Sequence, residues 1–310
     1  MTREFLSVEL MTMTAPRKIA CVEIGGVPIA LSTSDAGFLD LLRRRYDGFL
    51  SSSIPEFELE FDLTARGPAS EDGVRVRRNH DHGDDEEWVV ERGDLQARWD
   101  PRTGRGRVRQ NSNPYSLDSV LRIVHSLILA ERGGFLLHSA SAICEGRAYL
   151  FSGVSGAGKT TMTRLAPADV TLLTDEISYL RPSAGGYAAF GTPFAGELAR
   201  SGENCTAPVA ALFFLEQGPE NRVDELPAAD AIRRLMRNIL FFAEDRGLVE
   251  KLLATACEFV ARVPIRRLTF YPDGRVWDEI RNFDRNFDRD SARDSARDSV
   301  RDFQEAPQHA

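Results

Sequence analysis

The segment Gly153-Val154-Ser155-Gly156-Ala157-Gly158-Lys159-Thr160 decides the fold of the region around it. It matches the pattern G-x-x-x-x-G-K-[ST], and the apolar residues 148–151 just before it predict a strand. Glycines let backbone N–H groups point inward at an anion, and a helix that begins at Thr160 adds the positive end of its dipole. We therefore expect this segment to bind phosphate groups.

The side chains of this segment indicate a nucleoside triphosphate bound together with a divalent cation. Lys159 is expected to reach the β- and γ-phosphates, and the hydroxyl of Thr160 is expected to bind the metal. The predicted cofactors are therefore ATP and Mg²⁺. The residues expected to contact the nucleotide are Gly153, Ser155, Gly156, Ala157, Gly158, Lys159, Thr160 and Thr161.

A pair of acidic residues follows the next predicted strand. The helix after the phosphate-binding segment is short, because Pro167 ends it after barely two turns. Residues 170–174 then predict a strand, and Asp175 and Glu176 come directly after it. A carboxylate in this place is the natural partner of Mg²⁺, and a second one beside it can accept a proton. We expect Asp175 to bind the metal and either acid to act as the base.

Two other segments carry candidate site residues. Residues 191–200 place Gly, Pro and Gly around a glutamate, which indicates a shaped loop with Glu197 and Arg200 as candidate site charges. His138 lies on the strand expected to pair with the strand before the phosphate-binding segment, so its imidazole is expected near the phosphates or the attacking group. A packing or surface role is the alternative for each of these side chains.

Composition limits the classes of protein and partner. The chain has 310 residues, 42% hydrophobic and 28% charged, which predicts an ordinary globular protein of about two domains. The net charge of -8 argues against a nucleic-acid partner, because such proteins usually present a basic face. No apolar run is long enough to span a bilayer, and the four cysteines lack C-x-x-C spacing. We expect a cytoplasmic protein that binds neither nucleic acid nor membrane, with a homo-oligomer left open.

The order of predicted elements divides the chain into four parts. Residues 1–16 are expected to be a flexible leader, and 17–115 a small antiparallel α+β domain. Residues 116–280 are expected to form the nucleotide-binding α/β domain, in which 228–242 predict one amphipathic helix. Residues 281–310 are a charged low-complexity tail, either a solvent-exposed helix or disordered.

The predicted N-terminal domain offers structural signals but no chemistry. Gly25-Gly26 predicts a hairpin turn, and Asp35 is expected to cap a helix that runs to Tyr46. His80 and His82 suit a metal site only if a strand carries both to one face, and the surrounding Gly and Asp favour a solvated loop instead.

Together these segments resemble the HPr kinase/phosphorylase-related proteins. The resemblance covers about residues 130–280 and is carried by Leu137-His138, residues 153–160, Thr174-Asp175-Glu176 and the loop from Gly191 to Glu197. It implies a phosphoenolpyruvate-carboxykinase-like P-loop kinase domain, and so an α/β fold class that is α+β overall. It also implies a bacterial Mg²⁺-ATP-dependent kinase that phosphorylates a serine hydroxyl.

The resemblance implies roles for the matching residues. Glu176 stands where the family usually has a second aspartate, and its extra methylene changes the geometry of proton removal. The implied catalytic residues are His138, Asp175, Glu176 and Arg200, and the implied metal-binding residues are Thr160, Asp175 and Glu197.

The acceptor and two other functions stay open. The family's C-terminal signature, a Pro-Val segment running into Gly-Arg-Asn, has no counterpart here, and residues 263–266 are the nearest run. The acceptor is therefore an HPr-like protein or a ribosomal peptide precursor. The alternatives are a nucleotide-sensing adaptor that transfers no phosphate, and a carboxykinase-type enzyme, which the absence of a His or Lys constellation for a transition metal disfavours.

Overall fold

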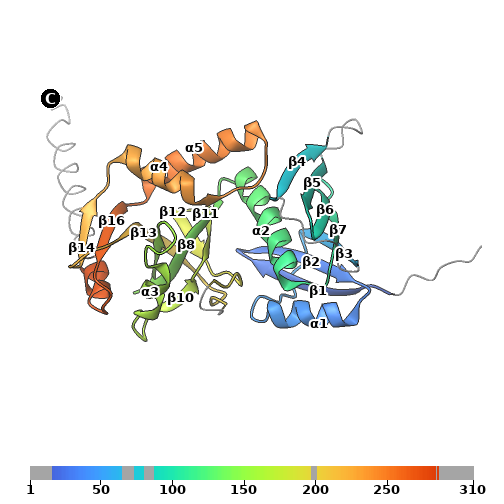
Figure 1. The fold of residues 1–310 in the computed structure, drawn as a ribbon, viewed down its shortest axis with the longest axis horizontal. Coiled ribbons are helices and arrows are strands. Elements are labelled where there is room, and N and C mark those ends of the chain that lie inside the picture. Colours follow the sequence, from blue (N-terminus) through green and yellow to red (C-terminus); the bar gives the residue numbers. More distant parts are fainter. Residues whose placement is uncertain (1–15, 65–72, 80–86, 197–200, 284, 286–310) are drawn as a thin grey trace, which may run out of the picture.

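The computed structural model describes residues 16–64, 73–79, 87–196, 201–283 and 285. Within these residues the protein is a mixed α/β structure with two β-sheets. Figure 1 shows the sheets side by side, with helix α2 (Pro114–Glu131) between them. In the described residues, no helix combines the length and the apolar character needed to cross a membrane.

The first sheet has seven strands in the order β1-β2-β3-β7-β6-β5-β4. Gly25 and Gly26 close the β1–β2 hairpin with φ of 62° and 71°, which confirms the predicted turn. The strands are β1 (Lys18–Ile24), β2 (Val27–Thr33), β3 (Phe57–Leu63), β4 (Arg75–Asn79), β5 (Glu87–Arg92), β6 (Leu95–Asp100) and β7 (Arg105–Gln110).

The prediction that this sheet is antiparallel was wrong in its centre. Strand β3 pairs in parallel with both β2 and β7. Helix α1 (Ala36–Arg45) carries the chain from β2 to β3, and such a crossover connection allows parallel pairing. Strands β4 to β7 then form a meander whose last strand lies against β3. The hydrophobic pattern of a single strand does not specify which strand it pairs with, so it could not predict this arrangement.

Helices α1 and α2 join the core of the first sheet. Asp35 caps α1 as predicted, because its carboxylate accepts the N–H of Phe38 at 2.7 Å. The buried Tyr46 donates its hydroxyl hydrogen to Asp118 of α2 at 2.8 Å, and Arg45 pairs with the same carboxylate. Burial and the charge of Asp118 raise the pKa of Tyr46 well above its ordinary value. These contacts hold α2 against the N-terminal half of the molecule.

The second sheet is organised around the long strand β8. The first half of β8 pairs with β11 and β15, and the second half pairs with β9 and β10. The strands are β8 (Phe135–Cys144), β9 (Arg147–Ser152), β10 (Thr171–Thr174), β11 (Ile177–Ser183), β12 (Gly186–Phe190), β13 (Thr206–Gln217), β14 (Arg222–Glu225), β15 (Ile239–Leu240) and β16 (Ile265–Phe270).

Four strands of this sheet end at the same edge. Strands β9, β13 and β16 are parallel neighbours. Strand β10 runs in the same direction, because β9 and β10 are both antiparallel to β8. In open α/β sheets, ligands bind outside the carboxyl ends of the strands. This edge is therefore the place to look for a site.

Helices cover both faces of the second sheet. Along β13 alternate side chains point to opposite faces, so Phe214 packs among residues of α4 and α5 while Phe213 packs near Trp277 on the other face. The helices are α3 (Lys159–Arg164), α4 (Ala228–Asn238) and α5 (Arg246–Arg262), and residues 276–283 are also helical.

Two sequence predictions for the C-terminal half need correction or lie outside the described residues. The helix expected over 228–242 ends at Asn238, because Ile239 and Leu240 instead form β15 and pair with β8. Backbone pairing with a buried strand overrides the helical periodicity. Most of the 281–310 tail lies outside the described residues, as do residues 1–15 and the two histidines at positions 80 and 82.

Candidate functional site

The predicted phosphate-binding segment forms the connection from β9 to α3. Gly156 and Gly158 have φ of 78° and 112°, in the left-handed region that favours glycine. A Cβ added to Gly158 would lie 2.4 Å from the ring of Phe270, so glycine is also required for close packing. The ammonium of Lys159 donates to the carbonyl oxygens of Gly153 at 3.0 Å and Val154 at 3.4 Å. The loop is thus folded around its own lysine.

The ends of four strands surround this loop. Strand β9 leads into it, and β10 ends at Thr174, next to Asp175. Strand β13 ends at Gln217, whose amide donates to the carbonyl of Gly156 at 2.9 Å. Strand β16 ends at Phe270, beneath Gly158. The shared strand direction therefore brings together stretches that are far apart in the sequence.

These stretches line a cavity of about 250 Å³, which we call the phosphate cavity. Ala157 is a buried residue of the loop, and Gly153 lines an adjoining cavity instead. Glu197 and Arg200 lie outside the described residues, so the structure does not place them. The lining residues are His138, Ser155, Gly156, Gly158, Lys159, Thr160, Thr161, Asp175, Glu176, Gly196 and Gln217.

Asp175 and Thr160 fit a Mg²⁺ ion that is also bound by phosphate. Asp175 is 4% exposed, and its carboxylate accepts the backbone N–H of Gly196 at 2.9 Å. Mg²⁺ takes oxygen ligands and usually needs only one or two carboxylates, with phosphates and waters completing its shell. No group of three or more His, Cys, Asp or Glu side chains is placed to hold a metal in the part of the chain that the structure describes. One carboxylate and one hydroxyl are too few for a complete metal site, and they fit Mg²⁺ only together with phosphate or water ligands.

Sequence reasoning missed the ion pair made by Glu176. Its carboxylate lies 2.8 Å from the guanidinium of Arg122, which comes from helix α2. The same guanidinium lies 5.1 Å from the ring centre of Phe194, within the range of a cation–π contact. No motif joins two positions that are 54 residues apart. The pair connects the phosphate cavity to the helix that packs against the N-terminal sheet.

His138 lines the phosphate cavity, and its backbone holds it in place. It is paired with Ile177 across the sheet, and its carbonyl accepts the hydroxyl of Ser152 at 2.9 Å. Burial lowers its pKa below the ordinary value of 6.5, and the positive charges of Lys159 and Arg122 lower it further. The imidazole is therefore neutral at pH 7, and can both donate and accept a hydrogen bond.

The site lies within the part of the chain that matches a known family. Residues 109–284 match a family model described as SynChlorMet cassette protein ScmC, which is more than half of the 310 residues. The chain belongs to the ScmC family. The ScmC match begins at the end of β7 and covers α2 and the whole second sheet, and so every described site residue. No curated protein matches the chain.

Membership of the HPr kinase/phosphorylase-related family, which the resemblance implied, was therefore wrong. The stretches that suggested it are a glycine-rich loop with a lysine, a strand ending in acids and a histidine on the next strand. Phosphate and metal binding require such features in unrelated proteins, so they indicate a chemistry and do not identify a family.

Proposed function

We propose that the protein transfers the terminal phosphate of ATP to a hydroxyl group of a peptide or protein acceptor, such as a serine side chain. The observation that supports this most is the phosphate cavity, where Lys159, Asp175 and Glu176 line one space with the glycine-rich loop. We also infer that the second sheet is a P-loop kinase fold. The parallel strands β9, β13 and β16, with the loop at their carboxyl edge, support this inference.

The loop and its lysine would bind and stabilise the phosphates. Phosphoryl transfer passes through a transition state whose charge is spread over the γ-phosphate oxygens, so catalysis is mostly positioning and electrostatic stabilisation. Lys159 now donates to Gly153 and Val154 at the start of the loop, and it would exchange these carbonyls for phosphate oxygens. Mg²⁺, held by the Thr160 hydroxyl and the Asp175 carboxylate, would supply further neutralisation of the terminal phosphates.

The acceptor proton would pass to Glu176. In the step, the acceptor oxygen bonds to the γ-phosphorus while the bond from that phosphorus to the β–γ bridging oxygen breaks. ADP leaves, and the acceptor hydrogen moves to the carboxylate. Arg122 orients this carboxylate from 2.8 Å, and the neutral imidazole of His138 can accept or donate a hydrogen bond beside it.

The test is transfer to a pool of serine-containing peptides in the presence of Mg²⁺-ATP, read by intact mass and by ADP release. We expect phosphopeptide and ADP in equal amounts, and loss of both with Asp175→Asn. ADP released with no phosphate gained by any peptide or protein would contradict the proposal.

A second function, a nucleotide-sensing adaptor, is favoured by the Arg122–Glu176 ion pair. This pair links the phosphate cavity to α2, whose buried residues belong to the core of the N-terminal sheet. Nucleotide bound in the cavity could then alter the N-terminal half without transfer. The adaptor predicts that Mg²⁺-ATP changes hydrogen exchange in α2 and that no acceptor gains phosphate.

A further inference from the structure

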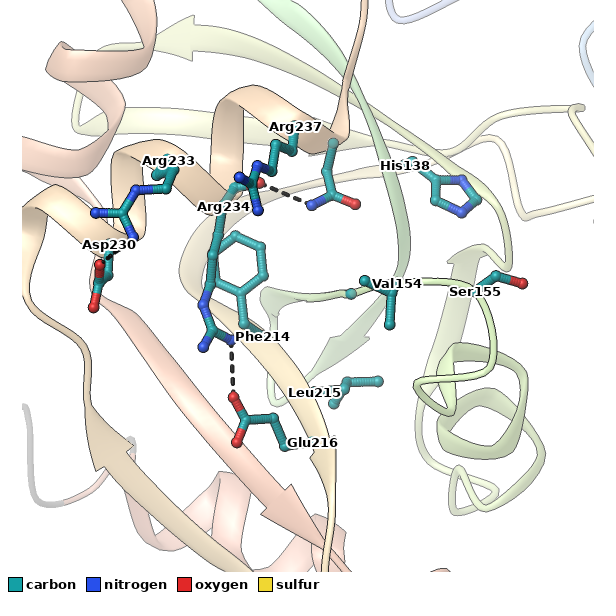
Figure 2. A pocket seen from close by; sticks show the side chains of 12 residues that line it. His138, Val154, Ser155, Phe214, Leu215, Glu216, Asp230, Arg233, Arg234 and Arg237 are labelled. Carbon is teal, nitrogen blue, oxygen red and sulfur yellow. Dashed lines mark hydrogen bonds and ion pairs between the residues drawn. The ribbon is translucent and has the colours of Figure 1, made fainter.

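A larger cavity of about 690 Å³ adjoins the phosphate cavity, and the nucleotide chemistry does not use it. The two share His138 and Ser155. We call the larger one the arginine cavity. Figure 2 shows the arginines of α4 on one side of it, with His138, Val154 and Ser155 on the other. Its lining residues are His138, Gly153, Val154, Ser155, Phe214, Leu215, Glu216, Asp230, Arg233, Arg234, Arg237 and Asn238.

The arginine cavity lies beside the part of the loop that Lys159 contacts. Its wall includes Gly153 and Val154, whose carbonyls accept from the ammonium of Lys159. In a loop of this kind the lysine reaches the β- and γ-phosphates. A molecule in the arginine cavity would therefore meet the γ-phosphate end of ATP.

Three arginines and two acidic residues line the polar wall, which leaves an excess of one positive charge. Arg233 pairs with Asp230 at 2.8 Å, and Arg234 pairs with Glu216 at 2.9 Å. The side chain of Arg237 makes no hydrogen bond or ion pair with any residue that the structure describes. The paired arginines are 60% and 38% exposed, and ion pairs at such positions are individually weak. Carboxylates of a ligand can replace them and gain bidentate contacts.

The remaining wall is apolar and is also unexplained by phosphate binding. Val154 is 79% exposed, although the loop needs only backbone atoms at this position. Its side chain lies opposite Leu215 and Phe214, at the end of β13 (Figure 2). A ligand with both apolar and acidic groups therefore fits the cavity better than a small charged metabolite does.

The spacing of the arginines matches an extended peptide. Arg233 and Arg237 are four residues apart on α4, which is about 6 Å along a helix axis. Alternate side chains of an extended peptide are about 6.6 Å apart and point the same way. Two acidic side chains at positions i and i+2 would thus have nearly the same spacing as the two arginine positions on the helix.

We propose that the arginine cavity binds the phosphate acceptor as an extended acidic peptide, with carboxylates on Arg233 and Arg237 and an apolar side chain on Val154. The acceptor role rests on the proposed kinase function. The peptide site itself rests on the cavity, the exposed valine and the arginine spacing.

The experiment compares two fluorescent serine peptides that differ only at two alternate positions, Glu in one and Gln in the other. Binding is measured by anisotropy with Mg²⁺ and a non-hydrolysable ATP analogue, and transfer is measured separately with Mg²⁺-ATP. We expect the acidic peptide to bind at least about tenfold more tightly, the equivalent of one charge-assisted contact. The double variant Arg233→Ala/Arg237→Ala should remove this preference and leave affinity for the ATP analogue unchanged.

The matched control is Arg246→Ala, a 93% exposed arginine on α5 whose loss should leave both affinities unchanged. In a charge-swap arm, Arg233→Glu/Arg237→Glu should reverse the preference toward a peptide with lysines at the two positions. Such a reversal would show that the variant is folded and that the cavity selects peptides by their charge.

Four outcomes would overturn the peptide site. They are equal binding of the two peptides, a preference that survives the double variant, loss of nucleotide affinity in that variant, or displacement of the fluorescent peptide by free glutamate as effectively as by the unlabelled acidic peptide. If both peptides are phosphorylated equally well, the proposed kinase function stands and the proposed peptide site is refuted. Charge-dependent peptide binding without any transfer would remove the kinase function and leave the peptide site without its acceptor role.

Discussion

Two cavities meet at His138 and Ser155, and different parts of the polypeptide build them. Backbone atoms of the β9–α3 loop form much of the phosphate cavity, with Lys159 and Asp175 added from the loop and the next strand end. Side chains of α4 and of the end of β13 line the arginine cavity across from Val154. Most of the phosphate cavity thus comes from two short stretches, residues 155–161 and 175–176, whereas the arginine cavity depends on how distant elements pack.

Lys159→Ala should have the largest effect, and it should affect the phosphate cavity far more than the arginine cavity. We expect phosphoryl transfer to fall about a thousandfold, or ~4 kcal/mol of transition-state stabilisation, because the variant removes the positive charge nearest the transferred phosphate. Acidic-peptide binding should change by less than about threefold, because the guanidinium groups on α4 remain. Transfer kinetics and anisotropy measure the two effects.

The matched control is Lys251→Ala, since Lys251 is an exposed lysine of α5 that pairs with Glu131. It should leave transfer unchanged. Normal transfer by Lys159→Ala would refute the role given to the phosphate cavity.

Gly158→Ala should test the backbone part of the phosphate cavity. Alanine is strained at φ 112°, and its Cβ would lie 2.4 Å from Phe270. We expect the free energy of unfolding to fall by about 2–3 kcal/mol. Denaturant unfolding measures this, with Gly185→Ala as the control because no atom lies within 4 Å of its added Cβ. Equal stability of the two variants would mean that the loop does not require a left-handed glycine.

Arg122→Met should show how far the phosphate cavity also depends on a distant side chain. Methionine keeps an apolar stem but loses the ion pair with Glu176, so the carboxylate is no longer oriented. We expect about a tenfold loss of kcat, ~1.4 kcal/mol, with little change in KM for ATP. Arg132→Met at the C-cap of the same helix, which breaks the pair with Glu56 and a cation–π contact with Phe57, is the control. A change in KM alone would place Arg122 in nucleotide binding.

The smallest expected effect is at the junction of the two cavities. His138 should titrate below its ordinary pKa of 6.5, because burial and the charge of Lys159 disfavour the imidazolium. Between that lowered pKa and 6.5 the unfolded chain binds more protons, so this group reduces stability as the pH falls through this range. Lys159→Ala should raise the pKa of His138. NMR titration of the ring protons measures this pKa. An unchanged value would mean that the charge of Lys159 does not act on His138.

The sequence predicted features that follow from local chemistry. Two short stretches contain the left-handed glycines, Lys159 and the acid after β10. Neighbouring residues imply the conformation of the first stretch and the position of the second at a strand end. The α1 cap at Asp35 and the Gly25-Gly26 turn were predictable for the same reason. In each case the physical cause lies within a few residues of its effect.

Features that depend on packing between distant elements were not predictable. Arg122 reaches Glu176 only because α2 lies against the second sheet, and Arg237 reaches the arginine cavity only because α4 lies beside the end of β13. The parallel pairing of β3 likewise depends on the path of α1 and on the return of β7. The family was also missed, because the residues that bind phosphate are shared by unrelated proteins.

A crystal structure of the protein with Mg²⁺, a non-hydrolysable ATP analogue and the acidic serine peptide would test the proposed site most directly. We expect the triphosphate on the loop at residues 153–160, Mg²⁺ on Thr160 and Asp175, and the serine hydroxyl entering past His138 from the arginine cavity. A nucleotide bound elsewhere, or a triphosphate whose γ-phosphate points away from both Asp175 and the arginine cavity, would contradict it.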